Sequence, residues 1–253
     1  MVRKFLTSTI LVIALSLFSL PVRAEDEDIN DPFETVNRGV FWFNTKLDDY
    51  LIGPITQGYR AVVPSRGRIA IKSFFDNLRY PMYLVSDLAQ LEFSHAGTHT
   101  ERFILNSTFG LLGLVDVAKD MGIEEHYTDI GVALGSNGVP TGPYLVIPIL
   151  GPSNARDFVG RICDIALYPT SYTNYISNTP QDVENAISVG GNSFAYIQYR
   201  AAVDQAVRAA KESSLDYYLF VRAAYAQLRQ GYIYDGNPPG DEDDSFDDQD
   251  EFK

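Results

Sequence analysis

The sequence predicts a mainly α-helical protein that contains one short β-hairpin or ordered loop. Over most of the chain, apolar residues recur at the spacing of three and four residues that is typical of amphipathic helices. Residues 131–152 break this pattern, because glycine and proline punctuate them. A chain of 253 residues with 45% hydrophobic side chains is long enough for one large domain with a substantial core.

The first 24 residues are typical of a cleavable secretory signal peptide. Arg3 and Lys4 supply positive charge, Leu6–Leu20 is apolar apart from small hydroxyl residues, and Val22-Arg23-Ala24 places small side chains where signal peptidase reads them. This apolar run is shorter than the ~20 residues that a helix needs to cross a bilayer. We expect cleavage after Ala24, and an uncleaved anchor is the alternative.

The rest of the chain is acidic. The net charge is −13, and removal of the three cations of the signal peptide makes it −16. Residues 233–253 end in GDEDDSFDDQDEFK, which has too many charged and too few apolar residues to fold. We therefore expect a single domain of residues 25–232, followed by a disordered acidic tail over residues 233–253. The excess of acids excludes a nucleic-acid-binding protein. The lone Cys163 excludes an intramolecular disulfide.

The first predicted helix runs from Pro32 to about Ile52. Asp31 is placed to cap this helix, and proline suits its first position because no backbone N–H is needed there. At 100° per residue, the helix carries an apolar stripe over about a third of its circumference. The stripe consists of Phe33, Val36, Val40, Phe43, Leu47, Tyr50 and Leu51.

Other side chains of this helix do not fit an ordinary surface helix. Asn37, Asn44 and Asp48 line one flank of the stripe, and Phe41 and Trp42 lie outside it. Several charged residues exclude a membrane-spanning helix, because each costs about 2.5–3.5 kcal/mol at the centre of a bilayer. A helix that lies in or just under the membrane interface fits better, and a helix buried on two sides by its neighbours is the alternative.

Gly53-Pro54 is expected to end this helix, and three more helical segments follow. ITQGYRAVV forms a short helix, Ser65–Tyr80 forms the next, and Pro81 begins a helix that is apolar nearly all round. The uncharged stretch Phe103–Val115 is too short to span a bilayer, so it belongs to a core or to a membrane interface.

The helix over residues 65–80 has a basic face. Arg66, Arg68 and Lys72 gather opposite its apolar side, which is unusual in so acidic a chain. Such a face could bind phosphate headgroups or an acidic partner, and an ordinary solvated face is the alternative.

The second half of the chain begins with the segment that breaks the helical pattern. Glycine and proline disfavour a helix over residues 131–152, GSNG is typical of a turn, and YLVIP of a short strand. Three helices are then expected: one capped by Ser153 that runs to Leu167, one over Asp182–Lys211 with a possible interruption at Gly190-Gly191, and one over Leu215–Arg229.

No catalytic or metal-binding motif emerges from the sequence. His95 and His99 are one helical turn apart, but HAGTH lacks the glutamate of a zinc-protease helix, and no third ligand follows at a recognisable spacing. A nucleophile elbow and a phosphate-binding loop are also missing, since GSNG places Ser136 in the wrong frame. We therefore expect no metal, no cofactor and no enzymatic activity.

Five ordered segments resemble the MlaA/VacJ family. DPFETVNRGVFWFNTKLDDYLIGP is similar to the family's opening signature, and DYYLFVRAAYAQLR to its final helix. ERFILNSTFGLLGLVDVA, GPYLVIPILGPSNARD and DIALYP resemble the intervening blocks in the same order. One departure is that residues 1–24 contain no cysteine, whereas typical members are lipidated on a cysteine at the end of the signal.

The resemblance implies a helical ring in the inner leaflet of the outer membrane, with an amphipathic central channel. Members of the family remove mislocalised phospholipids from the outer leaflet and pass them to a periplasmic carrier, typically beside trimeric porins. A periplasmic lipid hydrolase and a non-catalytic surface interaction protein are the alternatives.

This reading gives each group of candidate residues a role. The expected lipid contacts are Phe41, Trp42 and Phe43, and the expected channel lining is Asn37, Asn44 and Asp48. Headgroups or a partner would meet Arg66, Arg68 and Lys72. A gate in the glycine-rich segment would hinge at Gly135, Gly138 and Gly142, because glycine reaches positive φ without steric cost.

Overall fold

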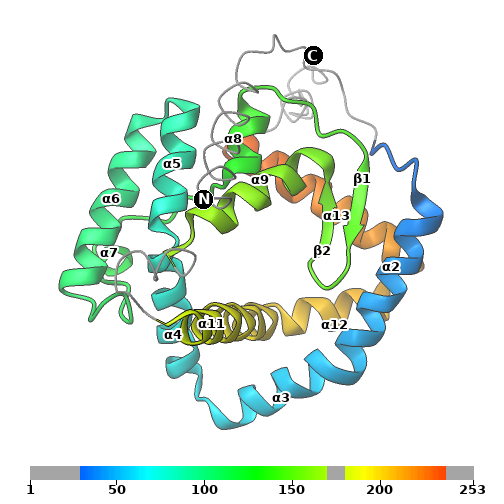
Figure 1. Cartoon of the computed structure of the whole chain (residues 1–253), viewed down its shortest axis with the longest axis horizontal. Helices are drawn as coiled ribbons and strands as arrows, with labels where there is room; N and C mark the ends of the chain where they lie inside the picture. The colour runs from blue at the N-terminus through cyan, green and yellow to red at the C-terminus, as the bar shows by residue number, and fades with distance from the viewer. Residues whose placement is uncertain (1–28, 170–179, 238–253) are drawn as a thin grey trace, which may run out of the picture.

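The helices of the protein are arranged as a ring, with a small hairpin on the inner side of one of them (Figure 1). The computed structural model describes residues 29–169 and 180–237. It confirms the predicted mainly helical fold with one short β-hairpin. The predicted signal peptide lies outside the described residues, as does the acidic tail beyond residue 237.

The described elements follow one another around the ring. The helices of the first half are α2 (Glu34–Leu47), the π-helical turn η1 (Asp48–Ile52), α3 (Gly53–Val62), α4 (Ser65–Leu78), α5 (Tyr80–Gln90), α6 (Phe93–Thr108) and α7 (Val117–Asp120). The second half contains α8 (Ile130–Ser136), β1 (Tyr144–Ile147), β2 (Gly151–Asn154), α9 (Ala155–Leu167), α11 (Gln181–Ala202), α12 (Asp204–Ser213) and α13 (Tyr217–Ile233).

The predicted break at Gly53-Pro54 is wrong, because the helix continues through this point. In η1 the backbone N–H of Gly53 donates to the carbonyl oxygen of Asp48, five residues earlier. Pro54 then falls in the first turn of α3, where its missing N–H costs no helical hydrogen bond. Asp31 does not cap α2, whose N-cap residue is Phe33; the Asp31 carboxylate accepts a hydrogen bond from Arg222 of α13 instead.

The turn predicted in GSNG is found at Asn137-Gly138, but the residues before it were wrongly expected to be non-helical, because residues 130–136 form the mostly buried helix α8. Asp129 caps this helix, since its carboxylate accepts from the N–H of Val132 at 2.7 Å. The glycines serve close packing: a Cβ on Gly160 of α9 would lie 2.4 Å from the nitrogen of Gly131. Glycine lowers helix propensity by about 1 kcal/mol, and here it permits two helices to touch.

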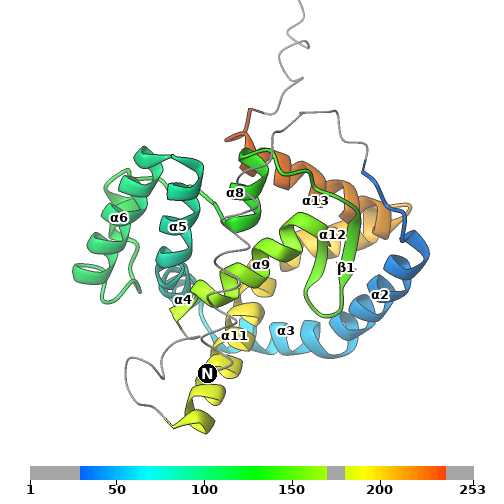
Figure 2. The same ribbon diagram turned by 45° about the horizontal axis from the view of Figure 1, so that its top comes forward.

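The strand is confirmed and is completed by a second one. β1 pairs antiparallel with β2, with Tyr144 opposite Asn154 and Ile147 opposite Gly151. In both views of the ribbon the hairpin lies inside the ring, where β1 faces α2 and β2 faces α9 and α13 (Figures 1 and 2).

The last helices differ from the prediction at their boundaries. Asn154, rather than Ser153, caps α9, because its side-chain oxygen accepts from the N–H of Asp157 at 2.7 Å. The long helix is interrupted at Val203 and not at Gly190-Gly191, which lie inside α11. α13 continues to Ile233, so the first residue assigned to the acidic tail closes this helix.

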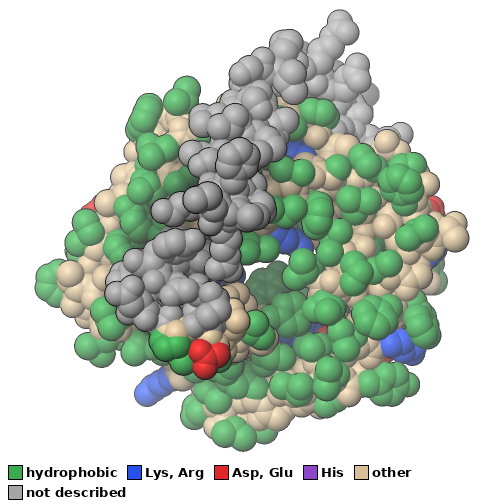
Figure 3. All heavy atoms as spheres, viewed as in Figure 1, with side chains coloured by type: hydrophobic (Ala, Val, Ile, Leu, Met, Phe, Trp, Pro, Cys, Tyr) green, Lys and Arg blue, Asp and Glu red, His purple; other side chains and the backbone are tan. Residues whose placement is uncertain are grey.

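The distribution of polar and apolar side chains between interior and surface is the reverse of that in an ordinary soluble protein. Among the described residues, buried polar and charged side chains outnumber buried hydrophobic ones, and large hydrophobic side chains are exposed on nearly every helix. Figure 3 shows hydrophobic side chains over much of the visible face, and a hollow near the centre of the ring. Much of the surface of the described residues is therefore apolar, and many of the contacts between elements are polar.

Candidate lipid-contact surface and polar interior

Most of the apolar stripe of the first predicted helix is exposed, although Val40 packs against the apolar core cluster. Val36 of α2 is 65% exposed and Tyr50 of η1 is 77% exposed, and Phe33, Phe43 and Leu51 are also exposed. A soluble helix would turn such a stripe toward the core. Here the opposite, polar flank packs against the protein, so the stripe is available to an apolar environment.

The three aromatic residues predicted to contact lipid separate into two groups. Trp42 is 64% exposed, and Phe43, which belongs to the apolar stripe, is 47% exposed. Phe41 does not belong to this surface, because its ring packs against Tyr217 and Tyr218 at centroid distances of 5.2 and 5.4 Å. It is part of the apolar cluster around the hairpin.

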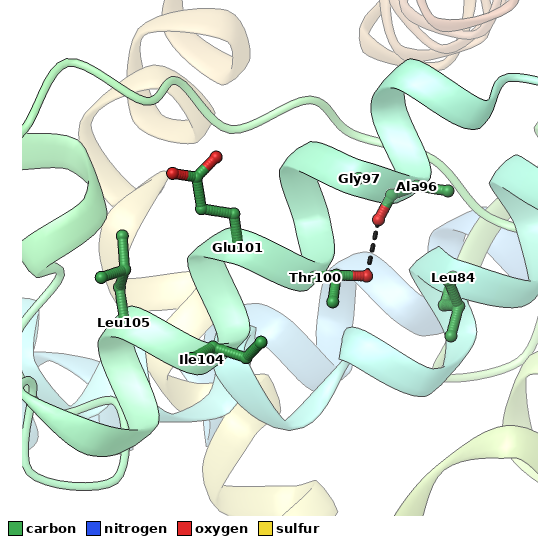
Figure 4. A pocket seen from close by; sticks show the side chains of 7 residues that line it. All are labelled: Leu84, Ala96, Gly97, Thr100, Glu101, Ile104 and Leu105. Atoms are coloured by element: carbon green, nitrogen blue, oxygen red, sulfur yellow. Dashed lines mark hydrogen bonds between the residues drawn. The ribbon is translucent and has the colours of Figure 1, made fainter.

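A second apolar surface lies on α5, α6 and the loop that follows. A groove of about 500 Å³ between the two helices is lined mainly by carbon, and Figure 4 shows Leu84 of α5 on one side and Ile104 of α6 on the other. The hydroxyl of Thr100 donates to the carbonyl of Ala96 at 2.7 Å, so it adds little polarity. Beyond α6, the loop over 109–115 exposes Leu111 and several neighbours.

Asn37 and Asn44 attach the hairpin to α2. The Asn37 amide donates to the carbonyl of Tyr144 at 3.0 Å and accepts from the N–H of Val146 at 2.9 Å. The Asn44 amide makes the same pair of bonds further along the hairpin. It donates to the carbonyl of Ile147 at 2.9 Å and accepts from the N–H of Ile149 at 2.7 Å. Each side chain therefore bonds the outer edge of β1 as a peptide group of a third strand would.

The spacing of the two asparagines matches the spacing of the strand. Seven helical residues span roughly 10.5 Å at 1.5 Å per residue, and three strand residues span roughly 10 Å. Asn37 is only 3% exposed, so it holds the hairpin and does not face an opening. This role replaces the predicted channel lining at Asn37, because all of its polar atoms are used within the protein.

Asp48 joins η1 to the C-terminal half of the ring. Its carboxylate accepts from Arg200 of α11 at 2.8 and 3.0 Å and from Lys211 of α12 at 2.8 Å. Burial alone would raise the pKa of Asp48, but these hydrogen bonds and charges lower it below its ordinary value. Asp48 is thus ionised at neutral pH and bridges three elements.

A buried charged cluster joins α8, α9 and α13. Arg229 donates to Asp129 at 2.6 and 2.9 Å and to Asp157 at 3.0 Å. Asp164 accepts from the N–H of Ile130 at 3.1 Å, and burial, together with the charge of Asp129, raises the pKa of Asp164 to about 8. Asp164 therefore holds a proton at neutral pH.

The predicted basic residues divide between a groove and two other positions. Arg68 lines a groove of about 430 Å³ together with Arg60 and Arg208, both of which contact the buried Asp204. Lys72 lies outside this groove, paired with Asp76 at 2.5 Å. Arg66 is exposed and forms no ion pair within the described ranges.

Sequence reasoning missed the other two groove arginines. They come from α3 and α12, which are more than a hundred residues apart along the chain, so no local pattern could connect them.

The three predicted gate glycines occupy different environments. Gly135 lies inside α8, where an added Cβ would meet Ile233 at 2.6 Å, so it does not belong to a non-helical hinge. Gly138 ends α8 with φ of +75°, and its N–H donates to Gly135 at 2.7 Å in a Schellman turn. Gly142 has φ of +65° and immediately precedes the strand region.

The histidine with the most suggestive surroundings is not a catalytic base. His99 lies 2.6 Å from Asp87 through Nδ1, which resembles part of a hydrolase triad. However, its Nε2 bonds the backbone carbonyl of His126 at 2.8 Å, so both ring nitrogens are engaged. His99 therefore fixes the segment before α8 in place.

No helix of the described chain combines the length and hydrophobicity that crossing a membrane requires.

Comparisons with known proteins agree with this architecture. A sequence model of the family described as "MlaA lipoprotein" matches residues 29–231. The chain is 32% identical over 212 residues to the Escherichia coli (strain K12) protein named "Intermembrane phospholipid transport system lipoprotein MlaA", covering 82% of this chain and 79% of that protein. It is 30% identical over 247 residues to the Haemophilus influenzae protein of the same name, covering 91% and 92%.

A solved structure has the same fold. It is described as "Structural basis for maintenance of bacterial outer membrane lipid asymmetry" and matches with a TM-score of 0.68 at 30% sequence identity, over 82% of this chain and 100% of that chain. With a family match over most of its length, the chain belongs to the MlaA lipoprotein family.

Proposed function

We propose that this protein is a non-catalytic phospholipid-transfer channel. It removes mislocalised phospholipids from the outer leaflet of the outer membrane and passes them to a periplasmic carrier, which maintains lipid asymmetry. The distribution of side chains carries this proposal: the many exposed apolar side chains suit contact with lipid tails, and the hollow near the centre of the ring offers a path for a lipid.

The central experiment combines bound lipid with function in the cell. The protein, purified from membrane fractions in mild detergent, should carry phospholipid that mass spectrometry detects. Expressed in a bacterium that lacks its own family member, it should lower the amount of phospholipid in the outer leaflet. A lipid-free protein that leaves the outer leaflet unchanged would favour the surface interaction protein instead.

We further propose that the groove of Arg60, Arg68 and Arg208 binds lipid phosphate. Three guanidinium groups line it, and among the described residues the one carboxylate that pairs with them is Asp204, which also pairs with Arg200 of α11. Next to it, Val62 is 81% exposed, so the groove lies where an apolar surface meets a charged one. Guanidinium groups suit phosphate because their N–H groups can donate in pairs.

Arg208→Gln tests the groove, with Arg66→Gln as the matched control. The Arg208 side chain is 52% exposed, so its removal should leave the fold intact. We expect weaker binding to vesicles that contain anionic phospholipid for the first variant and unchanged binding for the second, since Arg66 lies outside the groove. Equal binding by both variants would remove the groove from the transfer path.

The hairpin is proposed to act as the gate of the channel, with Gly138 and Gly142 as its hinge. Both have positive φ, so a larger side chain restricts the backbone there. Gly142→Val should change outer-leaflet phospholipid while the protein remains at normal abundance. A phospholipid change that only follows loss of protein would reduce both glycines to turn formers.

The protein is proposed to work at the periplasmic face of the outer membrane beside a trimeric porin. The apolar surface of α5, α6 and residues 109–115 supports a stable lateral contact of this kind. Photo-crosslinking from Leu111 should capture a porin in intact cells. Crosslinks to lipid alone would restrict this surface to membrane contact.

A further inference from the structure

Three side chains from distant parts of the chain meet at one point on the described surface. His95 comes from α6, His126 from the segment between α7 and α8, and Asp235 from the turn after α13. His126 Nδ1 lies 3.0 Å from one carboxylate oxygen of Asp235, and His95 Nε2 lies 3.9 Å from the other. The possible ligand atoms of all three lie within 4.8 Å of one another.

This arrangement has the chemistry of a transition-metal site. Imidazole nitrogen and carboxylate oxygen bind Zn²⁺ at about 2.0–2.2 Å in tetrahedral geometry, which places neighbouring ligand atoms roughly 3.3–3.5 Å apart. The observed separations of 3.0 and 3.9 Å bracket this spacing. The two distances run to different oxygens of Asp235, and the imidazole rings are stacked, so rotation of the rings would bring both nitrogens and one carboxylate oxygen to face a single ion.

We propose that His95, His126 and Asp235 bind one Zn²⁺ ion or a divalent metal of similar preference. Two nitrogen ligands and one oxygen ligand favour Zn²⁺ over Mg²⁺ and Ca²⁺, which prefer oxygen alone. The Asp235 side chain is 53% exposed, so the fourth position is open to water.

The surrounding structure holds two of the ligands in place. The backbone of His126 is fixed by His99, whose Nε2 bonds the His126 carbonyl at 2.8 Å. The two imidazole rings of the site are stacked at a centroid distance of 4.1 Å.

The third ligand reaches the site through an unusual backbone conformation. Asp235 has φ of +52°, a conformation that few non-glycine residues adopt, and Gly236 follows with φ of +83°. The N–H of Gly236 donates to the carbonyl of Gly231 at 2.8 Å, which turns the chain back over the two histidines. This left-handed residue places a carboxylate where the metal requires one.

A bound ion would connect the C-terminal end of α13 to α6. No other described group of histidine, cysteine and acidic side chains brings three ligand atoms together in this way.

Cobalt binding tests the proposal, because Co²⁺ can replace Zn²⁺ in such sites and, unlike Zn²⁺, absorbs visible light. The full chain should bind one Co²⁺ with the intense visible absorption of tetrahedral coordination, and Zn²⁺ should displace it. Residues 238–253 contain no histidine, so binding by the acidic end alone would give only the weak spectrum of an oxygen-coordinated ion.

Asp235→Asn and His95→Ala identify the site, with Asp120→Asn as the control. Both site residues lie at the surface, and circular dichroism would verify that each variant remains helical. We expect each site variant to lose at least tenfold in Co²⁺ affinity and Asp120→Asn to bind as the natural chain does. The proposal is overturned by an oxygen-only spectrum, or by equal affinities across the three variants.

Discussion

Replacement of Asn37 by alanine should detach the hairpin from α2. The change removes one amide that bonds both the carbonyl of Tyr144 and the N–H of Val146, and both strand residues are buried. A buried polar group that loses its partner costs about 1–3 kcal/mol. Two such groups therefore predict a loss of about 2–6 kcal/mol in the free energy of unfolding.

Asn44→Ala is the matched control for this prediction. Asn44 makes the same pair of bonds, but its bond to Ile147 is partly buried and its bond to Ile149 is exposed. Water can replace exposed partners, so we expect a loss of only about 0.5–1.5 kcal/mol, the net value of an ordinary hydrogen bond.

Urea unfolding in mild detergent, followed by circular dichroism, measures both variants. Asn37→Ala should shift the midpoint several times further than Asn44→Ala, without a change in the slope of the transition. The reasoning is refuted if the two variants lose equal stability, because burial of the strand edge would then not set the cost.

Three other predictions concern the surface, the interior and the N-terminus. Replacing Trp42 and Phe43 together by serine should shift the protein from membrane to soluble fractions with its helicity intact, because each buried aromatic is worth roughly 1.5–3 kcal/mol in an apolar environment. Phe41→Ser should instead destabilise the fold, and retained membrane binding by the double variant would contradict the lipid-contact role. For Asp164, the folded-state pKa of about 8 exceeds the unfolded value of about 3.9, so the protein loses stability as pH rises between these values. Asp164→Asn should remove this slope in urea titrations, and an unchanged slope would assign it to another group. Intact mass should show a mature chain cleaved after Ala24 without an acyl group; a chain that starts at Met1, or added acyl mass, would contradict this.

The amphipathic pattern of the first helix was readable from the sequence, but its orientation was not. Periodicity identified Val36 and Phe43 on one face and Asn37 on its flank. A stripe of this kind looks the same whether it meets a protein core or lipid. The aromatic residues outside the stripe and the resemblance to a family favoured lipid, but only the structure revealed that Asn37 bonds the edge of a strand 107 residues away.

Other features depend on tertiary contacts that a single sequence does not reveal. Gly131 looked like part of a loop because glycine disfavours helices, yet it permits α8 to touch Gly160 of α9. His95 was compared with His99, one turn away, whereas its structural neighbours are His126 and Asp235. In each case the deciding contact joins residues that are far apart along the chain.

Ion pairs between residues that are far apart along the chain also determine when this ring can close. Asp31, Asp48 and Asp129 find their arginine partners 191, 152 and 100 residues later in the chain. Until the last helices are available, these carboxylates lack their partners, so the first half of the ring lacks these stabilising contacts. Such distant closures slow folding, because chain entropy is lost before the contacts repay it. The arginines of α11 and α13 therefore complete the ring, because each pairs with a carboxylate that precedes it by 100 residues or more.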